Sequence, residues 1–97
     1  MRVIYVDIDE TIANTPDDRD YHKSTPRKDM IEKINKLYDE GNEIVYWTAR
    51  GSRTGINWYD LTKKQLTTWG AKHHELRCDK PYYDVFYDDK TMRIEEL

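Results

Sequence analysis

The first residues that could do chemistry are three carboxylates that follow a short apolar run near the start of the chain. The stretch VIYVDIDETI carries Asp7, Asp9 and Glu10 directly after the apolar residues 3–6. In extended backbone, residues two apart point the same way, so Asp7 and Asp9 are predicted to face one site. Burying carboxylates is costly unless a positive charge compensates them. The stretch therefore predicts a site that binds a cation.

A second acidic pair, Asp88 and Asp89, follows the stretch YDVFY near the C-terminus. If the strands that end at Asp7 and Asp88 are neighbours, four carboxylates meet at the carboxyl ends of the strands, where open parallel sheets bind ligands. Like charges that close would raise each other's pKa values or push the strands apart. Mg²⁺ resolves this conflict, because it favours oxygen ligands and commonly pairs one or two carboxylates with a substrate phosphate. The acids therefore predict a Mg²⁺ ion and a phosphate bound with it.

The elements that must position these acids follow from the pattern of apolar residues. Strands are predicted over residues 2–6, 43–47, 73–77 and 83–87. Helices are predicted over residues 26–40, with Thr25 as the N-cap, and over residues 56–69, with Tyr59, Leu66 and Trp69 in the core. Residues 13–26 are expected to form a polar loop without a core of its own.

Strand, helix, strand, helix, strand is the order of an α/β fold with a parallel sheet. Right-handed crossovers are expected to place helices on both faces, which gives three layers. The whole chain, residues 1–97, is predicted to form a single domain with a small core.

Composition narrows the classes of function. The net charge of -3 and the pI near 5.6 give no general attraction to nucleic acid or to an anionic membrane. No apolar run approaches the roughly 20 residues that span a bilayer, and the N-terminal run is too short for a signal peptide. The single Cys78 cannot form an internal disulfide, so a cytoplasmic protein is expected.

Three stretches together resemble the four motifs of the haloacid dehalogenase (HAD) superfamily of phosphohydrolases. DIDET matches the D-x-D-x-T signature, IVYWT resembles the second motif, and KPYYDVFYDD resembles the third and fourth, a Lys followed by a strand that ends in paired Asp. The stretches come in the family's order and span residues 3–89. One departure is Glu10, which stands where the best-known form of the family has Gly. The resemblance implies a Rossmann-like, HAD-like parallel sheet and a phosphatase that uses Mg²⁺.

The resemblance also implies a role for each matching acid. Asp7 would be the nucleophile that attacks phosphorus and forms an aspartyl-phosphate, and Asp9 would be the general acid–base. The metal would be held by the Asp7 side chain, the Asp9 backbone carbonyl and Asp88. Asp89 would bind the metal directly or through a water.

The second and third motifs imply the substrate contacts. Thr48 would hydrogen-bond the transferring phosphoryl group, and Lys80 would offset its charge and that of Asp7. Ala49 and Arg50 follow Thr48 and are predicted to contact the substrate too. Arg50 is either a surface arginine or a group that reaches an anionic part of the substrate.

The gaps between the motifs are too short for the inserted cap domain of larger HAD enzymes, so the chain resembles the capless members. Within these it looks most like the small phosphatases linked to capsule or surface polysaccharide biosynthesis. An open site would admit a large substrate; alternatively, a neighbouring subunit of a dimer or tetramer covers it and permits small sugar phosphates.

The leading prediction is a Mg²⁺-dependent phosphomonoester hydrolase acting on a sugar phosphate or a similar small metabolite. A nucleotide or nucleic-acid end phosphatase is the first alternative, although the acidic balance argues against it because phosphate-backbone binding needs clustered Lys and Arg. A catalytically inactive, metal-dependent binding module is the second alternative.

Overall fold

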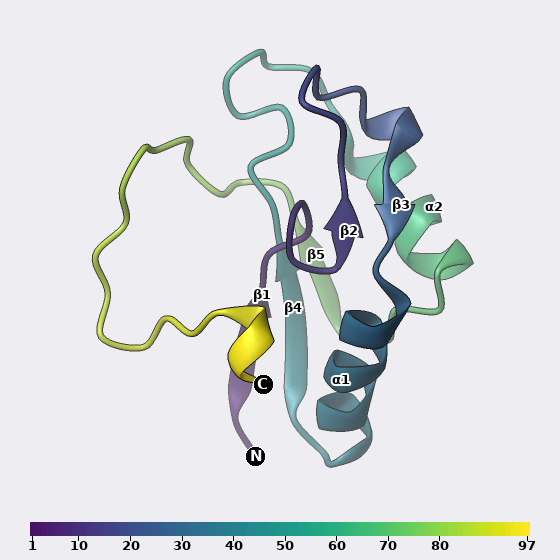
Figure 1. The fold of residues 1–97 in the computed structure, drawn as a ribbon, viewed down its shortest axis with the longest axis vertical. Coiled ribbons are helices and arrows are strands. Elements are labelled where there is room, and N and C mark those ends of the chain that lie inside the picture. Colours follow the sequence, from purple (N-terminus) through teal and green to yellow (C-terminus); the bar gives the residue numbers. More distant parts are fainter.

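Three parallel strands form the main sheet of the computed structural model, which describes residues 1–97 (Figure 1). They are β1 (Val3–Val6), β4 (Glu43–Trp47) and β5 (Glu75–Arg77), and they lie in the order β1-β4-β5. β4 is the central strand, with Tyr5 of β1 beside Val45 in the parallel register. The predicted α/β fold with a parallel sheet is confirmed, and so are the three strands themselves to within one or two residues.

Two helices, α1 (Lys28–Asp39) and α2 (Tyr59–Thr68), pack on the same face of this sheet (Figure 1). The prediction of helices on both faces is therefore wrong for this chain. Both crossovers step in the same direction, from β1 to β4 and from β4 to β5, and right-handed crossovers in one direction put their helices on one side. No helix here has both the length and the apolar character needed to cross a bilayer.

The core lies between this face of the sheet and the two helices. Its fully or nearly fully buried members alternate along the strands and recur at helical spacing along α1: Val6, Ile44, Tyr46, Leu76, Met30, Ile31 and Ile34. Leu66 of α2 is completely buried and Trp69 packs against the cluster, as predicted. Tyr59, the first residue of α2, is 40% exposed, so its assignment to the core is wrong.

Residues 10–26, called the flap here, are more ordered than the predicted loop. They contain a two-stranded antiparallel ribbon, β2 (Ala13–Asn14) with β3 (Thr25–Pro26), and a short 3-10 helix η1 (Tyr21–Lys23). Ile12 and Ala13 belong to the main core. Because Thr25 and Pro26 form the ribbon, α1 begins two residues later than predicted.

The strand predicted over residues 83–87 is absent. Residues 81–93, called the arm here, have no regular structure, and every residue of the arm is exposed. In Figure 1 the arm is the yellow-green segment that swings away from the sheet and returns beside β1 through the 3-10 helix η2 (Ile94–Glu96). The physical reason is that β1 pairs only with β4, and residues 83–87 find no partner for their backbone groups.

The second face of the sheet carries no helix. Val3 and Tyr5 of β1 are 56% and 47% exposed on it. Trp47 packs edge-on against Tyr5 with ring centroids 5.5 Å apart, and Arg77 donates a hydrogen bond to the Tyr5 hydroxyl. The domain is thus a two-layer structure, and the predicted three layers are not formed by one chain.

Candidate active site

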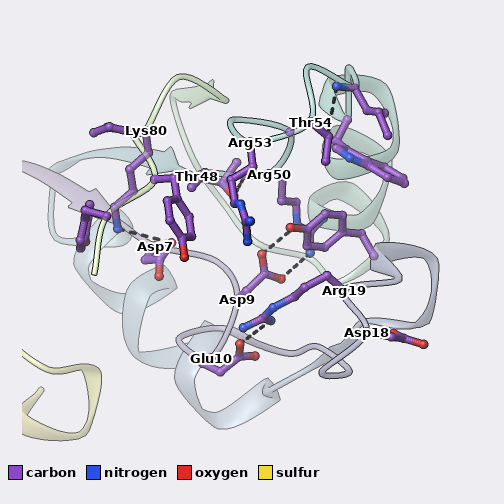
Figure 2. Close-up of a pocket in the computed structure, with 18 of the residues that line it drawn as sticks. Asp7, Asp9, Glu10, Asp18, Arg19, Thr48, Arg50, Arg53, Thr54 and Lys80 are labelled. Atoms are coloured by element: carbon purple, nitrogen blue, oxygen red, sulfur yellow. Dashed lines mark hydrogen bonds and ion pairs between the residues drawn. The ribbon is translucent and has the colours of Figure 1, made fainter. Parts of the chain in front are cut away.

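An open cleft of ≈ 860 Å³ lies at the carboxyl ends of β1 and β4 (Figure 2). The structure brings four sequence-predicted catalytic residues together here, because Asp7, Asp9, Thr48 and Lys80 all line the cleft. The predicted substrate contacts Ala49 and Arg50 line it too, along with residues of the flap and of the loop that follows β4: Glu10, Asp17, Asp18, Arg19, Tyr21, Gly51, Arg53, Thr54, Ile56 and Trp58.

Asp7 follows β1 directly and presents a half-buried carboxylate to the cleft. Its ion partner is Lys80, whose Nζ lies 3.6 Å from Oδ1 (Figure 2). Burial raises the pKa of Asp7 above its ordinary value, and nearby Asp9 acts in the same direction. Lys80 and the Ile8 backbone N–H act against this rise. The Asp7 carboxyl group therefore has one cation beside it and an open side toward the cleft.

Lys80 is fixed at the end of β4 by its backbone as well as by its side chain. Its N–H donates to the Thr48 carbonyl at 3.2 Å, and its own carbonyl accepts from the Ser52 hydroxyl. Its Nζ lies 5.7 Å from the Trp47 ring and 5.6 Å from the Tyr83 ring, so aromatic faces also hold the ammonium. Lys80 thus occupies the position that the third motif predicts, close to the first.

Arg50 is neither a surface residue nor free to reach a ligand, which corrects both readings of its role. Its side chain is fully buried, and Nε and Nη2 donate to the two oxygens of Asp9 at 3.1 and 2.8 Å. The remaining N–H groups donate to Thr62 at 3.0 Å, to Gln65 at 2.6 Å and to Ser24 at 3.3 Å. All five donors of the guanidinium are used inside the protein.

Asp9 is consequently the centre of a network that joins three parts of the chain. Besides Arg50, the Thr15 hydroxyl donates to its Oδ1 at 2.5 Å. Sequence reasoning missed Thr15 and Ser24 of the flap and Thr62 and Gln65 of α2. The available signal was weak: Thr62 and Gln65 are three apart on one helix face, but nothing local identifies the residue they bind.

Thr48 is buried at the end of β4 and keeps one hydrogen-bonding function for the cleft. Its backbone N–H donates to the Arg77 carbonyl at 2.9 Å, and its Oγ1 accepts the Arg50 backbone N–H at 3.1 Å. The hydroxyl proton has no acceptor within the chain. Thr48 can therefore donate to a ligand oxygen, as the second motif predicts.

Cations also stand at the rim of the cleft. Arg53 is exposed, lies over the Tyr82 ring at 4.7 Å, and has no carboxylate within ion-pair distance. Arg19 is paired with Glu10 at 2.5 Å and is therefore partly neutralised. Arg53 and Lys80 are the cations best placed for an anionic ligand, since guanidinium and ammonium groups both bind phosphate oxygens well.

The predicted metal ligands are only partly brought together. Asp88 and Asp89 lie on the exposed arm and do not line the cleft. Asp88 instead accepts hydrogen bonds from the Lys90 N–H and the Thr91 hydroxyl. No group of three or more His, Cys, Asp or Glu side chains that could hold a metal ion occurs in the structure.

One chain therefore does not fit the Mg²⁺ site that the motifs imply. Asp7 and Asp9, two of the three residues in the implied ligand set, line the cleft, but Asp88 does not. The donor set is short of one protein carboxylate. The condition that the first and last predicted strands are neighbours is not met in the single chain, because residues 83–87 form no strand.

The comparisons with known proteins give one informative relative. No protein-family model matches the chain, and no curated protein matches it. The crystal structure of a structural-genomics target from Vibrio cholerae has a TM-score of 0.85 and 32% sequence identity, over 99% of this chain and 86% of that chain. At this identity and coverage, the chain belongs to the same protein family as the Vibrio cholerae protein.

Proposed function

We propose that the protein is a phosphomonoester hydrolase in which Asp7 attacks phosphorus. The observation that carries this proposal is the arrangement of Asp7 and Lys80, 3.6 Å apart across a cleft that the Thr48 hydroxyl also faces. A carboxylate beside an ammonium and a free hydroxyl donor is suited to a phosphoryl group, whose negative charge needs positioned donors and cations.

In the first step an oxygen of Asp7 forms a bond to phosphorus while the bond to the leaving oxygen breaks. Asp9, as the general acid, supplies a proton to that oxygen, which leaves as an alcohol. In the second step water attacks the aspartyl-phosphate, Asp9 accepts the water proton, and phosphate leaves with Asp7 restored. Lys80 offsets the charge of the phosphoryl oxygens, and Thr48 donates a hydrogen bond to one of them.

Asp9 retains a site for this proton in spite of its contacts. Its Oδ1 accepts from both Arg50 and Thr15, whereas Oδ2 accepts a single bond, from Arg50. Each carboxylate oxygen has two lone pairs, so Oδ2 keeps one for a leaving oxygen or a water. Arg50 holds the Asp9 carboxylate in one orientation, which supports the role of Asp9 as a positioned general acid–base.

The substrate proposed is a sugar phosphate or a similar small metabolite. A cleft of ≈ 860 Å³ is within the usual range for small-molecule sites, and Arg53 and Lys80 give it anion-binding groups. The finer assignment is to a capless, Rossmann-like fold of the HAD type with Mg²⁺ as cofactor, and it rests on the four motifs. A cytoplasmic location is proposed from the lone Cys78, which has no disulfide partner.

The proposal is tested by phosphate release from sugar phosphates, nucleotides and an aryl phosphate, with Mg²⁺ and with EDTA. Asp7→Asn should abolish release, while the matched control Asp39→Asn, a surface carboxylate paired with Lys72, should leave it unchanged. Equal release by Asp7→Asn would remove Asp7 from the reaction. A folded wild-type protein that releases no phosphate would favour the binding-module alternative.

A further inference from the structure

We infer that the arm of one copy of this chain pairs with β1 of a second copy and carries Asp88 to the partner's Asp7. The inference rests on the proposed function for the use of the completed site, but the pairing itself is argued from the fold. Two features of the single chain support this pairing: the arm is apolar and exposed, and the outer edge of β1 has no partner strand.

The arm is unusually apolar for a segment that lies in water. Tyr82, Val85, Phe86 and Tyr87 are 57%, 64%, 50% and 94% exposed. Contiguous apolar surface of this kind on a soluble domain marks an interaction site. β1 pairs only on its β4 side, so its other edge presents backbone N–H and C=O groups that a further strand can bind.

The chain is too short to place this strand on its own β1. Lys80 is held at the carboxyl end of the sheet by its N–H bond to Thr48. A strand parallel to β1 that ends with Asp88 beside Asp7 must start beside Arg2, about 16 Å away at roughly 3.3 Å per residue. Between Lys80 and residue 83 there are three residue steps, which span at most about 11 Å.

Other same-chain arrangements fail as well. A strand that ran antiparallel to β1 would start near Lys80 and deliver Asp88 to the amino end of β1, away from Asp7. An irregular loop that folded back to Asp7 would leave Val85, Phe86 and Tyr87 in water. A parallel strand from a second copy avoids both problems, because its start is free of Lys80 of the copy it joins.

The register that brings Asp88 to Asp7 matches apolar side chains on both faces of the sheet. It sets Tyr87 beside Val6, which faces the helices, and Phe86 beside Tyr5, which lies on the open face. It also sets Val85 beside Ile4. Adjacent residues of paired parallel strands point the same way, so these three arm side chains each meet an apolar neighbour. Residues 83–87 also have the strand-forming composition that the sequence predicts.

Charge points to the same arrangement. The cleft holds Arg53 without a carboxylate partner and Lys80 with Asp7 as its partner, and the arm carries two adjacent carboxylates, Asp88 and Asp89. Delivered to Asp7, they also supply the carboxylate that one chain lacks for the implied Mg²⁺ site.

A second copy, rather than another protein, is the partner because one chain carries both halves of the contact. The arm is anchored at both ends of its own domain: at Lys80, and at η2, where Ile94 packs against the core and Glu95 lies 3.8 Å from Arg27. Two copies related by a two-fold axis can exchange arms reciprocally. The arm of each copy then pairs with the free edge of β1 in the other copy and supplies Asp88 to the site of that copy.

Mixing two inactive variants tests the exchange. Asp7→Asn and Asp88→Asn are each expected to be inactive. When they are mixed and allowed to exchange subunits, one site of each mixed dimer holds both native residues, so about a quarter of wild-type turnover should return. If the wild type is active and the mixture stays inactive, the arm completes its own site and the inference is wrong.

A cross-link gives a readout that does not depend on activity. In a Cys78→Ser background, Tyr5→Cys with Phe86→Cys should form a disulfide between copies, seen as a dimer on a non-reducing gel, because the register sets these residues side by side. Tyr5→Cys with Val85→Cys is the matched control, since Val85 faces the other side, and should cross-link poorly.

A disulfide within one chain, or a monomer in sedimentation together with no cross-link, would overturn the inference. A wild type that hydrolyses no phosphoester would instead overturn the proposed function, and the cross-link would still decide whether arms are exchanged.

Discussion

Arg50 and Asp9 are 41 residues apart in the chain and meet through two hydrogen bonds inside the protein, at 3.1 and 2.8 Å. The Arg50 side chain has no exposure to solvent, and that of Asp9 has 16%. A paired charge of this kind stabilises little relative to an apolar pair, but removing one partner leaves the other charge buried and uncompensated. The pair therefore fixes the orientation of Asp9 at the cost of sensitivity to mutation.

Arg50→Met should lower the free energy of unfolding by about 3 kcal/mol or more, because it leaves the Asp9 carboxylate without its cation. It also removes the hydrogen bonds that Arg50 donates to Thr62 and Gln65. Urea denaturation measures this. Arg53→Met is the matched control, since Arg53 is exposed and has no ion pair, and it should change stability by less than about 0.5 kcal/mol. Equal effects of the two substitutions would contradict the network.

Asp7→Asn should raise the melting temperature near neutral pH in EDTA. Burial raises the pKa of Asp7 in the folded protein above the ordinary value of 3.8, so the folded state binds the proton more tightly than the unfolded state does. The charged carboxylate therefore costs stability at pH values above the raised pKa, and this cost disappears as the pH falls below about 4.

Melting curves of Asp7→Asn and wild type across this pH range test the sign. The gain of the variant should shrink as the pH falls. Asp39→Asn, a surface change, should give no such pH-dependent gain. A variant that melts lower than wild type near neutral pH would mean that the Lys80 contact outweighs burial.

Gly51→Ala should be far more harmful than Gly55→Ala. Both glycines have positive φ, +85° and +75°, so both substitutions introduce a similar backbone cost of about 1 kcal/mol. A Cβ at Gly51 would in addition clash with the Ile56 carbonyl oxygen, whereas a Cβ at Gly55 meets nothing within 4 Å. Gly51→Ala should therefore lose at least about 2 kcal/mol more in urea unfolding, and phosphate release should fall with it. Similar losses for both would argue against this loop conformation.

Tyr46→Phe should stabilise the protein. The Tyr46 hydroxyl is buried and has no hydrogen-bond partner, and burial also raises the pKa of the Tyr46 phenol. Removing an unpaired buried hydroxyl should raise the free energy of unfolding by about 1 kcal/mol. Thermal unfolding beside Tyr38→Phe, a half-buried tyrosine on α1, provides the comparison, and a loss of stability in Tyr46→Phe would imply a hidden partner for the hydroxyl.

The parts of the fold that were predictable are those with a continuous apolar run or a periodic apolar signal. Residues 43–47 carry such a run, the buried face of α1 carries a helical period, and both are found where the pattern predicts them. The ribbon of the flap has two residues in each strand, too few for any periodicity, so it could not be recognised. The helices fall on one face because strand order, which decides this, is a property of pairing between distant segments.

The candidate site likewise contains residues that could be predicted from the sequence and residues that could not. Asp7, Thr48 and Lys80 lie in short local motifs, and the structure brings them together as predicted. Arg50 could not be assigned from its neighbours, because its acceptors are Asp9 and residues of the flap and of α2, and only the folded chain shows that they surround it. Residues 83–87 have the composition of a strand, but composition cannot name the strand with which a segment pairs.

Both crossovers of the main sheet step from β1 toward β5, so the direction of winding reverses nowhere within one chain. Open α/β sheets form their ligand crevice at a topological switch point, where neighbouring crossovers leave in opposite directions. Asp7 stands instead at an outer margin, bounded by β4 on one side only. A strand laid beside β1 would move Asp7 from the margin to the interior of the sheet and create a switch point next to it. In this topology a two-walled crevice at Asp7 requires a strand that the single chain does not supply.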